Sequence, residues 1–222
     1  MKIHQEYLQA ILFRDLVERH DVSHPRALAD LAHWLIDNTA SLYSVNNLAG
    51  YLKSLGHHAT RPLISDWMEW FEDAFFLFTV RIYDASLARS NTNPKRIYCI
   101  DHALVRSTSS GILTNSGHML ENLVFVALRR LHENIYYYKT GTGREVDFIV
   151  PITGQTPMLI QVCETLAEPL TRKRETTALL KAMAECVSHT GIIVTRNESE
   201  QLVSDKGTIE VIPAWRFLLS PS

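Results

Sequence analysis

The hydrophobic periodicity of this chain changes near its middle, and this change constrains the fold more than any other feature. Before a Ser/Thr/Gly-rich stretch at residues 107–117, apolar residues recur mainly at helical spacing. After it, one helical segment leads into short runs rich in β-branched and aromatic residues, which are typical of strands. With 222 residues, the chain is long enough for two small cores. The pattern predicts two domains, at residues 1–108 and 109–222.

The first half is predicted to form a helical domain that ends in a pair of strands. Ser23, Ser44 and Thr60 are each placed to cap a helix, because hydroxyl side chains accept hydrogen bonds from the first turn. Helices followed by a two-stranded hairpin predict a winged helix. The expected helices lie at residues 3–20, from residue 25, at 45–55 and at 60–76, and the expected strands at 76–83 and 96–101, with a turn at 90–94.

The second half predicts a mixed sheet flanked by helices, in the order α-β-β-β-α-β-β. The fold class is therefore α/β, or α+β for the chain as a whole. One expected helix begins at Ser116, and a second spans residues 171–187. The expected strands lie at residues 135–140, 144–150, 158–164, 191–195 and 208–212.

Four polar residues in this second half form a candidate site. Asp147 lies in a strand-like run after the turn Gly141-Thr-Gly143, and Gln161 and Cys163 share one face of the next run. If the two strands are neighbours, Asp147 and Gln161 converge on one point. Glu121 lies one position off the apolar stripe of the preceding helix, at the edge expected to face the sheet. Oxygen ligands from Glu121, Asp147 and Gln161 could hold Mg²⁺ or Mn²⁺, which would activate water.

Several phrases of the sequence resemble a known family. They are Asn93-Pro-Lys-Arg-Ile-Tyr-Cys-Ile-Asp101, Leu120-Glu-Asn-Leu-Val-Phe125, Tyr138-Lys-Thr-Gly-Thr-Gly-Arg-Glu-Val-Asp-Phe148, Leu159-Ile-Gln-Val-Cys163 and Val211-Ile-Pro-Ala-Trp215. The second half resembles the PD-(D/E)XK nuclease-like fold, which includes Holliday-junction resolvases and restriction endonucleases. The whole chain resembles the C-terminal region of a family of prokaryotic AAA-type ATPases, in which a winged helix and a nuclease-like domain of unknown function follow the ATPase.

The resemblance implies roles for the four polar residues. Glu121, Asp147 and Gln161 would be the catalytic acids or their remnants, and Cys163 would occupy the position of the catalytic lysine. A thiol cannot supply the positive charge of a lysine, so the resemblance implies a degenerate nuclease site. The chain has no Gly-x-x-x-x-Gly-Lys-Ser/Thr loop, so ATP would be bound only by an N-terminal ATPase domain absent from this sequence.

Two other functions stay open at this stage. Lys139 or Lys173 could replace the missing lysine, which would make the chain a divalent-metal-dependent DNA endonuclease, although both lysines are more simply interpreted as solvent-exposed. The chain could instead be a protein-interaction module. A buried strand cysteine such as Cys163 is usually a small hydrophobic residue and not a nucleophile.

A second candidate site is a DNA-binding surface on the winged helix, for double-stranded or branched DNA. Helix-turn-helix proteins present early residues of the recognition helix to the major groove. The net charge of −2 gives no overall attraction to DNA, and Asp66, Glu69, Glu72 and Asp73 on the same helix oppose it. The residues predicted to contact nucleic acid are Thr60, Arg61, Ser65, Arg81, Lys95 and Arg96.

Cysteine usage and hydropathy indicate the compartment. Cys99, Cys163 and Cys186 are odd in number and form no Cys-x-x-Cys pair, which favours a reducing, cytoplasmic setting. No apolar run approaches the length of a membrane span, so no membrane partner is expected.

Overall fold

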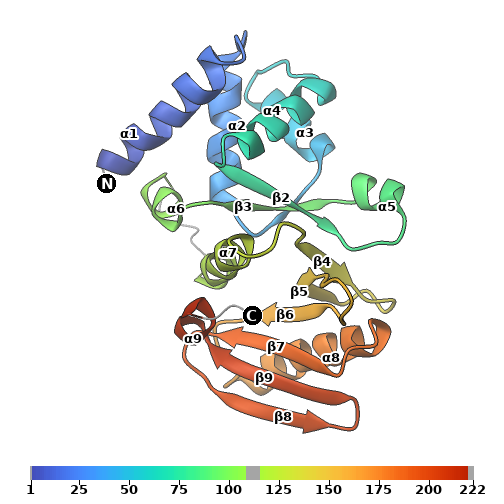
Figure 1. Cartoon of the computed structure of the whole chain (residues 1–222). Helices are drawn as coiled ribbons and strands as arrows, with labels where there is room; N and C mark the ends of the chain where they lie inside the picture. The colour runs from blue at the N-terminus through green and yellow to red at the C-terminus, as the bar shows by residue number, and fades with distance from the viewer. Residues whose placement is uncertain (1, 109–115, 220–222) are drawn as a thin grey trace. The chain divides into compact units, whose positions relative to one another are not determined.

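The computed structural model describes residues 2–108 and 116–219 (Figure 1). The chain has a mixed α/β fold and separates into two compact units. Unit 1 consists of Met1–Thr79 and Pro94–Asn122, and unit 2 of Val80–Asn93 and Leu123–Ser222. Most of the Ser/Thr/Gly stretch, residues 109–115, lies outside the described residues. The domain boundary at residues 108 and 109 therefore stays a prediction.

Unit 1 is built mainly from helices around one apolar core. The core takes Leu28, Leu31 and Leu35 from one helix and Trp67 and Phe71 from another, all fully buried. The helices are α1 (Lys2–Ala10), the π-helix η1 (Ile11–Glu18), α2 (Pro25–Asp37), α3 (Val45–Ser54), α4 (Arg61–Asp73), α6 (His102–Thr108) and the first part of α7 (Ser116–Arg129). The strands are β1 (Leu42–Tyr43), β3 (Lys95–Cys99) and the first half of β2 (Leu77–Ile82).

Hydroxyl caps set the start of two helices in unit 1, as predicted. The Ser44 hydroxyl accepts a hydrogen bond from the Asn47 amide at 3.2 Å, and the Thr60 hydroxyl accepts one from the Leu63 amide at 3.4 Å. The prediction for Ser23 is wrong. His24 is the residue before α2, with no side-chain cap, because Pro25 already supplies a helical φ at the first position.

The connection from β2 to β3 is longer than a turn. A short helix, α5 (Leu87–Thr92), occupies most of the segment predicted as a turn, and Ser86 caps it by accepting a bond from the Arg89 amide at 3.4 Å. In unit 1, β3 also pairs with β1 in antiparallel register, with Leu42 opposite Arg96. Helices followed by strands are present as expected, and their assignment as a winged helix stays a prediction.

Unit 2 contains a mixed sheet in the strand order β2-β4-β5-β6-β7-β9-β8. β4–β5, β5–β6 and β8–β9 are antiparallel, whereas β2–β4, β6–β7 and β7–β9 are parallel. The strands that follow β2 are β4 (Tyr136–Lys139), β5 (Glu145–Val150), β6 (Met158–Val162), β7 (Thr190–Thr195), β8 (Glu200–Ser204) and β9 (Gly207–Pro213). The helices are α5, the rest of α7, α8 (Pro169–Glu185) and α9 (Ala214–Leu219).

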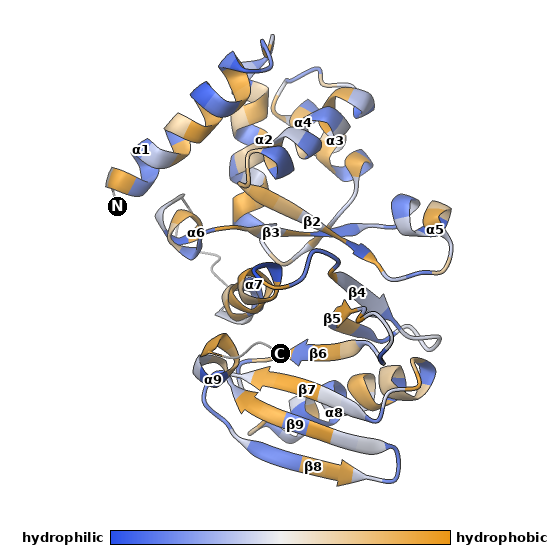
Figure 2. Ribbon diagram, in the orientation of Figure 1, coloured by the Kyte–Doolittle hydropathy of each residue, from blue (hydrophilic) through white to orange (hydrophobic). Residues whose placement is uncertain are grey.

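The edge strand β8 is absent from the sequence prediction. Its residues are mostly exposed, so it carries no alternation of buried and exposed positions to mark it. In Figure 2, β7 and β9 are largely hydrophobic, whereas β8 begins with hydrophilic residues. An exposed, polar edge strand is recognised by its pairing with β9, not by its own pattern.

Helix α8 packs closely against the sheet of unit 2, on strands β5, β6, β7 and β9. The approach is close at Gly191 in β7, where an added Cβ would lie 2.9 Å from the Met183 sulfur and 3.0 Å from Leu179. Glycine lets the helix approach the strand at this point. The buried face of α8 consists of Glu175, Ala178, Leu179, Ala182 and Met183.

Candidate functional site

The two strands that carry the candidate site are neighbours, as the sequence analysis required. β5 and β6 are antiparallel with Phe148 opposite Ile160, and this register places Asp147 opposite Gln161. Both side chains are buried. One Asp147 carboxylate oxygen accepts a hydrogen bond from the Val162 amide at 2.9 Å. Asp147 thus also contributes to the pairing of its strand with β6.

Helix α8 adds an acid that the sequence analysis missed. Glu175 is 5% exposed, and its Oε2 accepts a hydrogen bond from Gln161 Nε2 at 2.7 Å. Its Oε1 accepts from the neighbouring Arg174, 2.7 Å from Nε and 2.6 Å from Nη2. The acid could have been found from the sequence, because Glu175 continues the apolar stripe of Ala178, Leu179 and Ala182 at helical spacing.

The surroundings of Glu175 disfavour its charged form. Burial raises the pKa of the Glu175 carboxyl above its ordinary value of 4.5. The Arg174 guanidinium acts against burial, and the nearby Asp147 carboxylate raises the pKa further. The Asp147 carboxyl and the mostly exposed Arg174 guanidinium thus both act on Glu175, in opposite directions.

Two other groups of the site are incomplete or inert. The Oε1 atom of Gln161 is buried and has no hydrogen-bond partner among the described residues. Such an acceptor costs about 1–3 kcal/mol of stability unless a donor or a cation reaches it. Burial, with help from the Glu175, Glu198 and Asp147 charges, raises the pKa of the Cys163 thiol to about 12. Cys163 therefore stays protonated and cannot act as a cation or as a thiolate nucleophile.

Glu121 belongs to unit 1, on helix α7, where other groups bind it. It is 7% exposed, forms an ion pair with Arg96 Nη1, and accepts a hydrogen bond from the Tyr98 hydroxyl at 2.6 Å. The adjacent Asn122 bonds both backbone groups of Cys99, at 2.8 and 2.9 Å. These bonds tie the start of α7 to β3 within unit 1.

The Glu121 ion pair also changes the interpretation of Arg96. Arg96 is predicted as a phosphate contact, whereas its side chain is buried and paired with Glu121. The alternation of β3 does not reveal this, because four of its five residues are buried.

The other predicted nucleic-acid contacts are spread over both units. Thr60 caps α4, and Arg61 follows it on the surface, while Ser65 and Lys95 are half-buried. Arg81 lies in unit 2, and its Nη1 donates to Asn91 Oδ1 at 2.9 Å. Asp66, Glu69 and Asp73 are exposed on α4.

The two candidate replacement lysines do not lie against Glu175. Lys139 Nζ is 3.8 Å from Glu145, with half of its side chain exposed, and Lys173 is exposed on α8. The cation next to the buried acid is instead Arg174, the residue after Lys173. Within residues 2–108 and 116–219, no group of three or more His, Cys, Asp or Glu side chains could hold a metal ion. The Mg²⁺ or Mn²⁺ site of Glu121, Asp147 and Gln161 stays a prediction.

None of the helices in the described part of the chain has the length and apolar character needed to cross a membrane.

Two family models match the chain. Residues 1–114 match a Domain of unknown function (DUF8612), and residues 116–217 match a second Domain of unknown function (DUF4143). The second domain is found in proteins associated with AAA-type ATPases.

Two curated relatives are longer than this chain. An uncharacterized protein of Methanocaldococcus jannaschii, MJ1544, is 32% identical over 229 residues, which covers 99% of this chain and 50% of the relative. An uncharacterized protein of Haemophilus influenzae is 26% identical over 141 residues, covering 63% of this chain and 35% of that protein. The chain thus spans half or less of the length of these relatives.

One solved structure shows a slight likeness. It is a refined half-complex from a tetradecameric assembly of Thermococcus gammatolerans McrB AAA+ hexamers with bound McrC. The match has a TM-score of 0.35 and 11% identity, and covers 82% of this chain and 46% of that one.

Proposed function

The chain belongs to the family of the Domain of unknown function DUF8612, and from this premise we propose that it is a regulatory, binding half of an AAA-type ATPase. In this proposal unit 1 contains a winged helix, and unit 2 is a PD-(D/E)XK nuclease-like domain whose catalytic set is degenerate. The chain binds DNA or a partner protein and does not cut DNA. ATP is bound by an ATPase domain outside this sequence.

The observation that carries the proposal is the chemistry of the site in unit 2. Nuclease-like sites need a cation beside their acids, and the residue at the position of the lysine is the buried, protonated Cys163. The second acid of the motif is an amide, Gln161, and that amide donates to Glu175. The cationic side chain that contacts Glu175, Arg174, is 68% exposed and turned to one carboxylate oxygen. This arrangement supports a retained fold without the catalytic chemistry.

The state of Glu121 supports the same proposal. Glu121 Oε1 accepts from both Arg96 and Tyr98, so this oxygen is already bonded to groups of unit 1. This bonding suits a residue that stabilises unit 1.

Two further observations support the link to an ATPase. The matched segment is only half of the M. jannaschii relative, so that protein has about as much chain again, which is enough for an ATPase domain. The DUF4143 match points to the same association.

Incubation of the purified chain with linear and branched DNA, in Mg²⁺ or Mn²⁺, tests the proposal. We expect no cleavage, together with a gel shift at low salt that weakens as salt rises. Absence of any shift would move the proposal from DNA to a protein partner. Cleavage that is lost in Asp147→Ala, but kept in a control variant at the exposed Asp205, Asp205→Ala, would overturn it.

One observation favours a second function, a divalent-metal-dependent endonuclease. Gln161 Oε1 is a buried oxygen without a partner among the described residues, and it belongs to a side chain that also contacts Glu175. A metal held between Asp147, Gln161 and Glu175 would satisfy it. Cleavage by wild type that is lost in Glu175→Gln would establish this alternative.

A further inference from the structure

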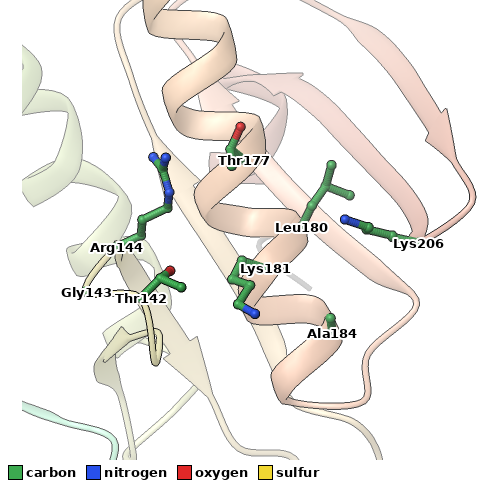
Figure 3. A pocket seen from close by; sticks show the side chains of 8 residues that line it. All are labelled: Thr142, Gly143, Arg144, Thr177, Leu180, Lys181, Ala184 and Lys206. Atoms are coloured by element: carbon green, nitrogen blue, oxygen red, sulfur yellow. The ribbon is translucent and has the colours of Figure 1, made fainter.

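A basic pocket in unit 2 lies apart from the candidate site and has no role in the proposed function. It has a volume of about 640 Å³, and helix α8 forms its floor (Figure 3). The turn between β4 and β5 contributes Thr142 and Arg144, and the turn between β8 and β9 contributes Lys206. In Figure 3, Arg144 and Lys206 flank α8 from opposite sides.

The charged side chains that line this basic pocket are all cationic. Its lining includes the cationic side chains of Arg144, Lys181 and Lys206 and no carboxylate. Lys181 is partly neutralised by Glu185, 3.6 Å away. Neither the Arg144 guanidinium nor the Lys206 ammonium has a hydrogen-bond or ion-pair partner in the described part of the chain. Two uncompensated cations thus face one pocket in a chain whose net charge is −2.

The remaining lining suits a ligand with a phosphate group and an apolar body. Thr142 and Thr177 supply hydroxyl donors, and Leu180 supplies an apolar surface between the cations. A planar guanidinium binds two phosphate oxygens at once, whereas an ammonium acts as a point charge. The volume lies within the range of about 300–1,000 Å³ that is usual for small-ligand sites.

We propose that the basic pocket of Arg144, Lys181 and Lys206 binds a phosphate group of a nucleotide, either free in solution or within a nucleic-acid strand. Arg144 and Lys206 hold the phosphate oxygens, the two threonine hydroxyls donate to them, and Leu180 contacts the base or sugar. This inference does not depend on the proposed function, because it involves neither the nuclease-like site nor unit 1.

Binding of three probes to the full chain tests the pocket and separates the two sources. Calorimetry measures binding of pyrophosphate and of ATP, and fluorescence anisotropy measures binding of a short labelled single-stranded DNA. The double variant Arg144→Gln/Lys206→Gln is expected to weaken binding at least about tenfold, since each charged hydrogen bond contributes that much or more. The control is Lys173→Gln, which removes one positive charge from an exposed position on α8, outside the pocket lining.

The outcomes are distinct. Loss of ATP and pyrophosphate binding in the double variant, without such a loss in Lys173→Gln, supports a free nucleotide as the ligand. Loss of DNA binding alone, with no binding of the small probes by wild type, supports a phosphate within a strand. No binding of any probe, or an equal loss in Lys173→Gln, overturns the proposal.

Two further measurements guard against a folding artefact and locate the ligand. Thermal unfolding of the double variant is expected to match wild type, because both side chains are exposed. Acetylation of wild type, followed by mass spectrometry, is expected to show that the bound probe protects Lys206 and Lys181 but not Lys173. Equal protection of all three lysines would also contradict the proposal.

Discussion

Each unit of the molecule buries a glutamate next to an arginine, and the two pairs differ in how deeply the arginine itself is buried. In unit 1, both side chains of the Glu121–Arg96 pair are at most 10% exposed, and the Tyr98 hydroxyl adds a third group. In unit 2, Glu175 is as buried, but its partner Arg174 is 68% exposed. Beside it, Gln161 Oε1 has no partner in the described residues.

The difference separates a stabilising cluster from one suited to a ligand. A buried ion pair with further hydrogen bonds is strongly destabilised by the loss of either partner. A buried carboxyl whose cation lies in solvent, next to an unpaired acceptor, retains the capacity to bind a donor or a cation. Of the two acids, Glu121 and Glu175, it is Glu121, emphasised by the family resemblance, whose contacts mainly stabilise the fold.

The largest expected effect is on the unit 1 pair. Arg96→Met should lower the free energy of unfolding by about 3–5 kcal/mol, because Glu121 keeps a buried charge without its cation. Urea unfolding followed by circular dichroism measures this change. The double variant Arg96→Met/Glu121→Met should recover most of the loss. A control at Arg89, which is 70% exposed and pairs with Asp84, is Arg89→Met, which should change stability by less than about 1 kcal/mol.

If Arg96→Met costs no more than the Arg89 control, the unit 1 cluster is not the structural element that its geometry indicates.

Thiol reactivity compares the surroundings of the two clusters directly. Burial raises the pKa of Cys99 and of Cys163 from 9.0 to about 12, which lowers the thiolate fraction about a thousandfold. With iodoacetamide at about pH 8, the half-buried Cys186 should react first, then Cys163 at 8% exposed, and the fully buried Cys99 last. Mass spectrometry over time measures the order. Faster reaction of Cys99 than of Cys163 would mean that the surroundings of the unit 1 cluster are the more accessible to solvent.

A smaller, pH-dependent effect is expected at Glu175. Because the folded-state pKa is raised, the folded protein binds a proton at higher pH than the unfolded chain does. The ionised carboxyl therefore costs stability above the folded pKa, and this cost disappears as the pH falls toward 4.5. Glu175→Gln should shift stability by about 1 kcal/mol at neutral pH. The difference in unfolding free energy, variant minus wild type, should be more positive at neutral pH than near pH 4.5.

Unfolding curves across this pH range, with Glu145→Gln as the control at a less buried acid, measure the difference. The opposite trend with pH would mean that the site stabilises the carboxylate, as a bound cation would.

The smallest expected effect is at Arg174. Arg174→Ala should cost less than about 1 kcal/mol, since a mostly exposed guanidinium is screened by water and salt. Unfolding at low and high ionic strength measures it, and the difference from wild type should shrink as salt rises. A loss comparable to that of Arg96→Met would show that the unit 2 cluster is as closed as that of unit 1.

Local patterns were sufficient to predict most elements and one pair of the site. Alternation in two consecutive strand-like runs predicts that Asp147 and Gln161 share a site, and the β5–β6 register places them opposite each other. Ser44 and Thr60 are recognised as caps because capping involves residues only three apart. Helix α8 and the strands on either side of it were also predicted close to their observed bounds.

Only the tertiary structure decided which groups meet across the fold. The residues around Glu175 do not indicate that it contacts Gln161, fourteen residues away. The residues around Arg96 do not indicate that it pairs with Glu121, twenty-five residues away. The edge strand β8 is likewise defined by its partner β9. The physical reason is that the period of a strand or helix selects the face on which a side chain lies, whereas the packing of distant segments selects what faces it.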